Sequence, residues 1–426
     1  MKFDSGESFA RELDERDPLK AYRQQFYIPK QQNGDDEFYF CGNSLGLQPR
    51  RCQDFLGLEL EKWQQLGVKG HVQGEYPWMP YHEFLQDDLA MLVGAKPKEV
   101  VPMNSLTTNL HLMLVSFYRP SPSRYKILIE DHAFPSDQYA LMSHIKLHGL
   151  SEDALIRLKP KPGHQLLDQE DWMEALDKEG DTIALVLLPG VQYYTGQVSP
   201  MQAITVAAHD KGCIVGADLA HAVGNIPLEL HDWQLDFAVW CHYKYVNSGP
   251  GAVGGCFVHS MHHEKSSIHR FAGWWGHDKD SRFKMGDQFI PSKSVEAWQL
   301  SNPPILSVAA IRASLQIFRE VGGMDPLRKK SLALTGYLEF LLKNQLDDNL
   351  QIVSPSNPEH RGCQLSIQLQ ANPERSKRVF HFLREKGVTT DWREPNVMRV
   401  APVPLYNRFL DVYNFVALLK EGVSHA

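Results

Sequence analysis

Hydrophobic and polar positions alternate in blocks through the middle of the chain. Short runs rich in apolar and β-branched residues predict strands, and the runs lie at 125–130 (YKILIE), 182–188 (TIALVLL), 213–217, 236–241 and 252–259. A continuous apolar run such as 182–188 is typical of a strand buried on both faces of a sheet. We therefore expect a strand order in which most neighbours run parallel.

The segments between these strands have the spacing of amphipathic helices. The residues after Pro135 predict one helix that ends at Gly149, and 199–212 predict another, with Ser199 as its N-cap and Gly212 after its last turn. Strand–helix–strand units predict an α/β fold, in which helices cover both faces of a mostly parallel sheet.

The pattern changes after about residue 305, where SNPPIL (301–306) interrupts regular structure. Two long amphipathic helices, a strand at 363–370 and a further helix at 374–387 follow, as expected for a small α+β domain. We predict an N-terminal segment (1–49) that packs on both domains, a large domain (50–305) and a small C-terminal domain (306–426).

Composition narrows the class of protein. The 426 residues are 43% hydrophobic and 22% charged, which is typical of a globular protein. The net charge of −7 argues against a nucleic-acid partner, and no apolar run approaches the ~20 residues that span a bilayer. The polar N-terminus predicts no secretory signal, and six scattered cysteines predict a reduced, cytoplasmic protein.

Three motifs match known patterns without the required context. The segment from Gly42 to Gly46 fits G-x-S-x-G, so a serine hydrolase that uses Ser44 is one alternative, but the strand and helix of a nucleophile elbow are missing. The segment 249–254 fits G-x-G-x-x-G, yet it leads into a strand rather than a helix. His259, His262 and His263 lack a fourth ligand at metal spacing, so we expect a solvated loop and no metal.

A carboxylate and a lysine follow two neighbouring predicted strands. Asp218 comes at the end of one strand, with His221 three residues later, and Lys244 follows the next strand. Ligands of open α/β sheets bind at that edge. The pair can be a simple ion pair, or it can be a pyridoxal phosphate site, in which the lysine forms a Schiff base and the aspartate faces the pyridine nitrogen.

Two further segments favour the cofactor site. The residues 104–108 (NSLTT) precede an apolar helix, whose N-terminus offers N–H groups and hydroxyls to a phosphate. In AFPSD (133–137), Phe134 is placed to stack on an aromatic ring and Asp137 to reach its edge. Helix capping and core packing are the alternative interpretations of these residues.

The chain resembles the kynureninase family over nearly its whole length. The segments DLAHAVGN, CHYKYVNSGPG, AFPSD, YYTGQ, GWWGH, SNPPIL and RVAPVPLYN occur in the order found there. The resemblance implies the fold-type-I, class-V-aminotransferase-like architecture and pyridoxal 5'-phosphate as cofactor. It also implies a place in the kynurenine pathway of tryptophan catabolism, which leads to NAD biosynthesis, and a homodimer whose active sites are completed across the interface.

The resemblance also assigns site residues. Lys244 would hold the cofactor and move the α-proton, Asp218 would pair with the pyridine nitrogen, and Tyr243 would bind the phosphate and donate a proton. The other cofactor contacts would be Leu106, Thr107, Phe134, Asp137 and His221, with Trp274 and Asn302 from the second subunit. Arg399 would bind the substrate α-carboxylate, a task that suits a bidentate guanidinium. Pro189 stands where many relatives carry a hydroxyl, so that contact is not carried over.

The implied reaction is the hydrolytic cleavage of the Cβ–Cγ bond of L-kynurenine or 3-hydroxy-L-kynurenine, which yields an anthranilate and L-alanine. His71 and the Ser301–Asn302 pair match the form that prefers the 3-hydroxy substrate. Another class-V enzyme, such as a desulfurase or an aminotransferase, is the nearest alternative. A desulfurase needs a mobile cysteine between about residues 310 and 360, and the chain has none there.

Overall fold

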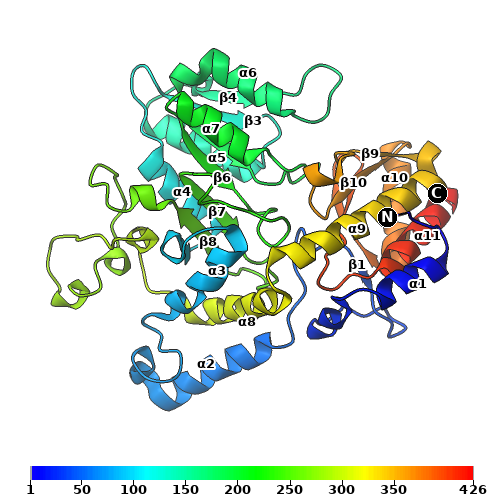
Figure 1. Cartoon of the computed structure of the whole chain (residues 1–426), viewed down its shortest axis with the longest axis horizontal. Coiled ribbons are helices and arrows are strands. Elements are labelled where there is room, and N and C mark those ends of the chain that lie inside the picture. The colour runs from blue at the N-terminus through cyan, green and yellow to red at the C-terminus, as the bar shows by residue number, and fades with distance from the viewer. Residues whose placement is uncertain (1, 426) are drawn as a thin grey trace.

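The computed structural model describes residues 2–425, and its larger lobe is built on a seven-stranded sheet (Figure 1). The strand order is β2 (Val100–Pro102), β8 (Gly254–Val258), β7 (Phe237–Cys241), β6 (Ile214–Asp218), β5 (Ile183–Pro189), β3 (Lys126–Glu130), β4 (Leu155–Leu158). The strands from β7 to β4 run parallel, whereas β8 is antiparallel to both β7 and β2. The predicted mostly parallel sheet is thus confirmed.

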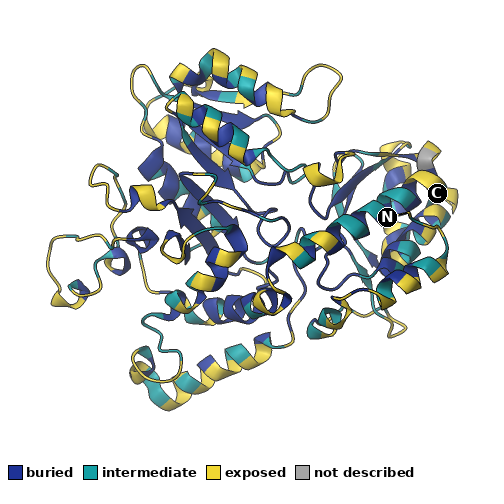
Figure 2. Ribbon diagram, viewed as in Figure 1, coloured by how far each residue is buried: buried dark blue, intermediate teal, exposed yellow. Residues whose placement is uncertain are grey.

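Helices cover both faces of this sheet. One face packs against α4 (Leu106–Phe117) and α5 (Pro135–Leu147), and the other against α3 (Gln86–Val93), α6 (Gln169–Glu179), α7 (Met201–Asp210) and α8 (Ile305–Val321). Along β5, Leu185 and Leu187 enter the first core while Val186 and Leu188 enter the second, which explains why this strand is apolar at every position. Figure 2 shows the central strands buried.

The smaller lobe contains a four-stranded antiparallel sheet. Its order is β12 (Asp391–Arg393), β13 (Val397–Val400), β10 (Leu365–Leu369), β9 (Leu350–Ile352), and it packs with α9 (Met324–Leu346), α10 (Pro373–Glu385) and α11 (Phe409–His425). The N-terminal helix α1 (Glu7–Glu15) contacts α11, and β1 (Phe38–Tyr39) pairs in parallel with β11 (Val388–Thr389). Within residues 2–425, no helix combines the length and apolar character needed to cross a membrane.

The N-terminal segment contributes side chains to both cores. Ala10 and Phe40 lie in the core of the smaller lobe, and Phe26 and Leu47 in that of the larger. The exposed helix α2 (Cys52–Leu66) then lies along α8. The domain boundaries stay a prediction.

The packing of α8 bears on where the second boundary falls. Its buried side chains, among them Ile311 and Leu315, join the core of the larger lobe. Two glycines with positive φ, Gly322 at +90° and Gly323 at +84°, then separate α8 from α9. We therefore propose a division between α8 and α9 in place of residue 305.

The predicted N-cap of α7 is wrong. The helix begins at Met201 after Pro200, and the Ser199 hydroxyl instead donates a hydrogen bond of 2.5 Å to the carbonyl of Pro189 at the end of β5. The carbonyl at the strand end needs a donor, and it outcompetes the helix N-terminus for this hydroxyl.

A buried ion-pair network at the start of β7 predicts a stability effect. Asp236 accepts hydrogen bonds from His209 (2.9 Å) and His262 (2.6 Å) and from the Val215 amide (2.7 Å). Burial alone would raise the pKa of Asp236, but these donors hold it at about 2. Because this pKa lies below the ordinary value, the carboxylate stabilises the fold above about pH 4, and the stabilisation is lost as the pH falls through 2.

We expect Asp236→Asn to lower the free energy of unfolding by about 2 kcal/mol at pH 7, as the pKa shift implies. Urea unfolding of both proteins measures this, with Asp153→Asn, at an exposed position, as the control. A variant as stable as wild type at pH 7 would contradict the role of this network.

Candidate active site

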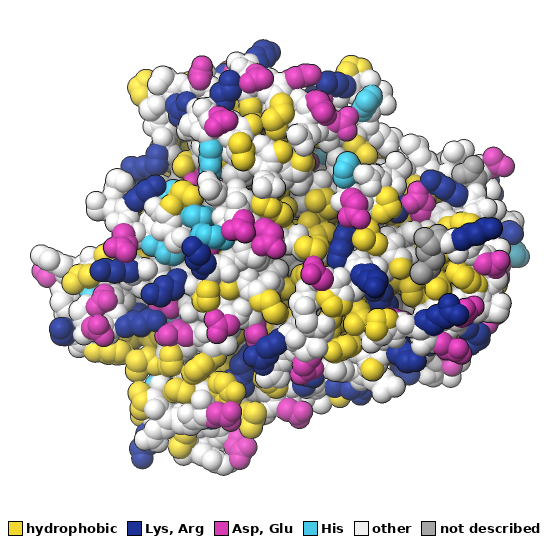
Figure 3. Space-filling view, viewed as in Figure 1, with side chains coloured by type: hydrophobic (Ala, Val, Ile, Leu, Met, Phe, Trp, Pro, Cys, Tyr) yellow, Lys and Arg dark blue, Asp and Glu magenta, His cyan; other side chains and the backbone are white. Residues whose placement is uncertain are grey.

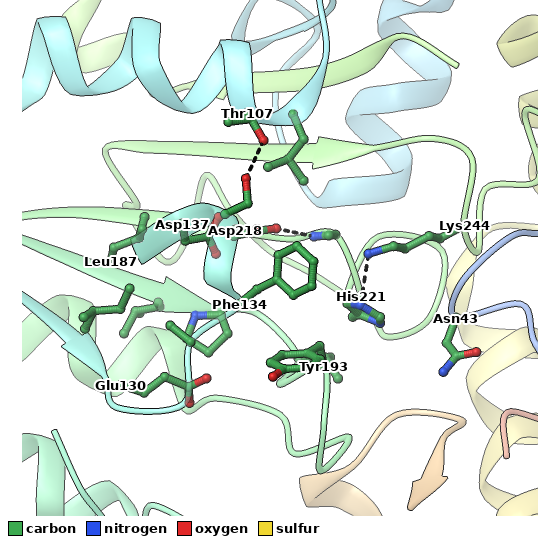
Figure 4. A pocket seen from close by; sticks show the side chains of 18 of the residues that line it. Asn43, Thr107, Glu130, Phe134, Asp137, Leu187, Tyr193, Asp218, His221 and Lys244 are labelled. Carbon is green, nitrogen blue, oxygen red and sulfur yellow. Dashed lines mark hydrogen bonds between the residues drawn. The ribbon is translucent and has the colours of Figure 1, made fainter. Parts of the chain in front are cut away.

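A cavity of about 250 Å³ lies at the carboxyl ends of the parallel strands β3, β5 and β6. Such strand ends are where open α/β sheets bind ligands. Eight residues that the sequence placed in the cofactor site line this cavity: Leu106, Thr107, Phe134, Asp137, Asp218, His221, Tyr243 and Lys244. Figure 4 shows most of them around one central space.

Lys244 and His221 form a close contact in the cavity wall. The Nζ atom of Lys244 lies 3.0 Å from Nε2 of His221, as the dashed line in Figure 4 marks. Complete burial lowers the pKa of His221 well below its ordinary value, and the positive charge of Lys244 lowers it further. The imidazole is therefore neutral and accepts at Nε2, which leaves its proton on Nδ1, an atom with no partner among the described residues.

Asp218 and Asp137 form a buried carboxyl pair. The Asp218 Oδ1 atom accepts a 2.7 Å bond from the Ala220 amide, and the two carboxyl groups are hydrogen-bonded to each other. Burial first, and then the charge of Asp218, raise the pKa of Asp137 well above its ordinary value. Asp137 is the member whose pKa is raised more, so it keeps a proton to share with Asp218 more readily than Asp218 does. Within residues 2–425 the Asp137 Oδ1 atom has no partner, so it can accept a bond from a ligand.

The N-terminus of α4 forms another part of the wall. The Thr107 hydroxyl lies 3.0 Å from the hydroxyl of Ser136, and the helix has no side-chain cap. A Cβ atom on Gly254 would lie 2.9 Å from the Trp240 carbonyl oxygen and 3.0 Å from the Leu106 nitrogen, so glycine suits the close approach of β8 to this helix start. Free N–H groups and the helix dipole make this end suited to an anion.

Two aromatic rings close the cavity. Phe134 is 42% exposed, and its ring centroid lies 5.3 Å from that of Tyr193 at an interplanar angle of 78°. In the view of Figure 4, the Phe134 ring lies between the Asp137–Asp218 pair and Lys244. Burial raises the pKa of the Tyr243 hydroxyl, which therefore stays protonated at neutral pH.

Arg399 lies behind the cavity wall. Its side chain is fully buried, pairs with Asp391 (2.6 Å), and donates to the Tyr193 carbonyl (2.7 Å) and the Ser44 hydroxyl (3.2 Å). Asn43, Ser44 and Arg393 line the cavity, whereas Arg399 does not.

Four predicted residues lie away from the cavity within a single chain. Trp274 is 45% exposed, and Ser301 and Asn302 are exposed as well. The His71 Nδ1 atom lies 3.1 Å from the Val68 carbonyl, and its ring contacts Trp78 edge-on. These residues can complete a site only if another copy of the chain brings them to it.

Sequence reasoning missed several lining residues. Glu130 ends β3 at the same edge as Asp218, so the strand-end rule could have found it. Burial raises its pKa to about 7 despite a hydrogen bond from Gln192. Tyr193 stands in a quoted motif without an assigned role, and Arg393 carries no local signal because its approach depends on the packing of the two lobes.

The serine-hydrolase alternative finds no support in this geometry. The Ser44 hydroxyl donates to Asp391 (2.5 Å) and accepts from Arg399, and among the described residues no histidine contacts it. A serine nucleophile needs a base within hydrogen-bond reach.

The expectation of a solvated histidine loop is wrong. His259, His262 and His263 are buried after β8, and each ring is hydrogen-bonded. His259 lies near Glu99 and His231 in a cluster of possible metal ligands. Both of its ring nitrogens are already used, by the Met261 amide (3.1 Å) and the His231 carbonyl (3.3 Å).

Comparisons with known proteins identify relatives along the whole chain. The family model for the kynureninase C-terminal domain matches residues 327–419. The chain is 52% identical to the kynureninase of Koribacter versatilis, over 97% of each chain. It is 51% identical to that of Myxococcus xanthus, over 98% of this chain and 97% of the relative.

Solved structures share the fold. An apo cysteine desulfurase from Thermococcus onnurineus has a TM-score of 0.73 at 18% identity, covering 92% of this chain and 95% of that one. A lysine-to-alanine mutant of C-DES, with glycine covalently linked to its PLP cofactor, has a TM-score of 0.76 at 17% identity. It covers 94% of this chain and 99% of that one. At these identities the likeness establishes the fold alone.

Proposed function

The chain belongs to the kynureninase family, and from this premise we propose that it cleaves the Cβ–Cγ bond of L-kynurenine with water and favours the 3-hydroxy substrate. Enzymes of this family are hydrolases of carbon–carbon bonds that use pyridoxal phosphate, and this chain is one of them. In the overall reaction, the water oxygen enters the carboxylate of the anthranilate, and the released β-carbon takes a proton to become the methyl group of L-alanine.

The observation that carries the proposal is the cavity in which Lys244 faces the carboxyl pair across an exposed aromatic ring. The residues fit pyridoxal phosphate: a lysine amine, a negatively charged carboxyl pair, an unpartnered Asp137 oxygen and a helix N-terminus for the phosphate. When bound, this cofactor withdraws electrons from the α-carbon of an amino acid and so acidifies its proton.

We propose distinct binding roles for the residues of the wall. Leu106 and Thr107 hold the phosphate through the start of α4, together with the Tyr243 hydroxyl. Asp218 holds a proton on the pyridine nitrogen, with Asp137 beside it, and Phe134 stacks on the ring. Removing the shared charge of the carboxyl pair would weaken this electrostatic support.

Lys244 and Tyr243 are the proposed proton carriers. Lys244 takes and returns the proton at the α-carbon, and the neutral His221 orients its amine through the 3.0 Å contact. Because burial raises its pKa, Tyr243 keeps its proton at neutral pH and so has one to donate.

We also propose a homodimer in which Trp274 and Asn302 reach the partner's cofactor. Exposed apolar side chains support such an interface, among them Trp63 (65% exposed), Val68 (81%) and Val72 (64%). Figure 3 shows hydrophobic side chains gathered at the lower left of the molecule, near the place of α2 in Figure 1. A cytoplasmic location stays a prediction, and the reduced cysteines expected from the sequence are its support.

The proposed substrate preference rests on His71, Ser301 and Asn302. Polar groups that bind the 3-hydroxyl would be left unpaired by the unhydroxylated substrate, which therefore binds less well in the transition state. The exposure of Ser301 and Asn302 is compatible with contact to a second copy's substrate.

The proposed function is tested by mixing the purified holoenzyme with each substrate and measuring the fluorescence of the aromatic product. We expect a yellow protein, trapping of the cofactor on Lys244 by borohydride, and the higher kcat/KM on 3-hydroxy-L-kynurenine. A colourless protein that a serine-directed phosphonate labels would overturn the proposal.

We expect His71→Trp to lower the ratio of kcat/KM for the 3-hydroxy substrate over that for kynurenine about 10-fold, since one hydrogen bond to the hydroxyl is lost. His381→Trp, at an exposed position of α10, is the control. An unchanged ratio would show that His71 does not recognise the hydroxyl.

A further inference from the structure

Two arginines and one aspartate meet on the strand pair β12–β13 of the smaller lobe. Asp391 pairs with Arg399 in the strand register, and Arg393 lies two residues along β12 from Asp391. Side chains two residues apart on a strand point to the same face. All three side chains therefore gather at one place, next to the cavity of the larger lobe.

The charge of Arg399 is already matched by Asp391. Nε of Arg399 lies 3.0 Å from Oδ1 of Asp391, and Nη2 lies 2.6 Å from Oδ2, a bidentate arrangement. The Tyr193 carbonyl and the Ser44 hydroxyl accept two further bonds, which leaves one of the five N–H groups of Arg399 free within the described chain. Burial opposes ionisation of Asp391, but the bond from Arg399 holds its pKa below the ordinary value.

Arg393 supplies the unmatched charge. It shares Asp391 with Arg399, at 3.0 Å from Nε to Oδ1 and 3.3 Å from Nη2 to Oδ2. Its side chain remains 36% exposed and lines the cavity, with its guanidinium 5.9 Å from the Tyr193 ring centroid. Two arginines and one aspartate sum to a net charge of +1. Arg399, whose charge is matched by Asp391, lies behind Ser44, whereas Arg393 faces the cavity.

Among the described residues that line this cavity, Lys244 and Arg393 are the lysine and arginine side chains. The proposed function assigns Lys244 to the cofactor. A monoanionic amino-acid substrate that enters the cavity then meets one free positive charge, on Arg393.

We propose that Arg393 is a second substrate-binding arginine, which supplies the net charge for the substrate α-carboxylate, while Asp391 holds Arg399 beside it. This inference rests on the proposed function, because it takes an amino acid as the substrate. It assigns the two arginines different tasks. Arg399, rigid and buried, fixes the position of Asp391, and Arg393, which lines the cavity, attracts the substrate carboxylate.

The test compares Arg393→Gln with Arg393→Lys on L-kynurenine and on its α-carboxamide, which lacks the negative charge. We expect Arg393→Gln to raise KM for L-kynurenine about 10- to 100-fold with little change in kcat, the size of one lost charge-assisted contact. Its kcat/KM on the carboxamide stays at the wild-type value. Arg393→Lys keeps the charge and gives a smaller rise in KM.

Binding of L-alanine to the holoenzyme, followed by cofactor absorbance, gives a second readout that needs no turnover. We expect Arg393→Gln to weaken this binding by about the same 10- to 100-fold, because the same contact is lost. Arg384→Gln removes one exposed arginine from α10 of the same lobe and is the matched control. Thermal unfolding verifies that each variant is folded.

If Arg393→Gln lost equal kcat/KM on L-kynurenine and on the carboxamide, the role of Arg393 would be overturned. An unchanged KM together with unchanged L-alanine binding would overturn it as well. A wild-type enzyme that cleaves neither substrate would overturn the proposed function instead, and the alanine measurement would still decide the role of Arg393.

Discussion

Replacing Lys244 with alanine is expected to lower turnover at least about 10³-fold while the protein stays folded. The amine is the proposed attachment point of the cofactor and the carrier of the α-proton, and the loss of proton transfer alone costs about 10²- to 10⁴-fold. Its hydrogen-bond partner in the described chain is His221, so the cost in stability is small. Product fluorescence measures the turnover, and thermal unfolding reports the fold.

Two controls sharpen this result. Lys265→Ala removes a lysine outside the cavity, whose amine lies 3.3 Å from Nδ1 of His262, and should leave kcat unchanged. Adding methylamine to Lys244→Ala should restore part of the turnover, because a free amine can enter the space and carry the proton. Substantial activity in Lys244→Ala without added amine would refute the assignment of this lysine.

The strand-end rule explains how much of this site could be predicted. Asp218 and Lys244 follow neighbouring parallel strands, so the sequence alone brings them to one edge. The sequence does not give the 3.0 Å contact between Lys244 and His221, which is visible only in the folded chain. The same holds for the carboxyl pair, because Asp137 comes from α5, far from Asp218 in sequence. The pairing of β8 with β2 likewise could not be predicted, because the two strands are far apart in sequence and no local pattern indicates that they meet.

Other features depended on packing between distant segments. The family resemblance pointed to Arg399, yet its burial behind Ser44 follows from how the N-terminal segment meets β13. The same packing brings Arg393 to the cavity, and no spacing in the sequence indicates this. The histidines after β8 were expected in solvent because their polar spacing resembles a loop, but Asp236 and nearby carbonyls satisfy them in the interior.

Replacing Asp218 with asparagine should lower activity and raise the stability of the apoenzyme together. We expect kcat/KM to fall about 10²- to 10³-fold, because a neutral amide cannot hold a proton on the pyridine nitrogen as the carboxylate can. Asp137 compensates in part: without the charge of Asp218 its pKa falls toward the ordinary value, and it ionises at a lower pH. The double variant with Asp137→Asn should therefore lose more activity than the two single effects predict.

Asp218→Asn should raise the stability of the apoenzyme although it lowers activity. A carboxyl whose pKa is raised on folding costs stability once the pH exceeds its ordinary value, and both members of this pair have raised pKa values. The Asp218→Asn variant keeps a side-chain oxygen that can accept from the Ala220 amide, but it lacks one of the two buried carboxyls whose ionisation costs stability. At pH 7.5 the melting temperature of the apoenzyme should rise by about 1–3 °C, and this gain should vanish near pH 3, where both carboxyls are protonated in either state. Loss of activity with a gain in stability would show that the two carboxyls are held together for catalysis. Loss of both activity and stability would instead indicate a structural role for Asp218.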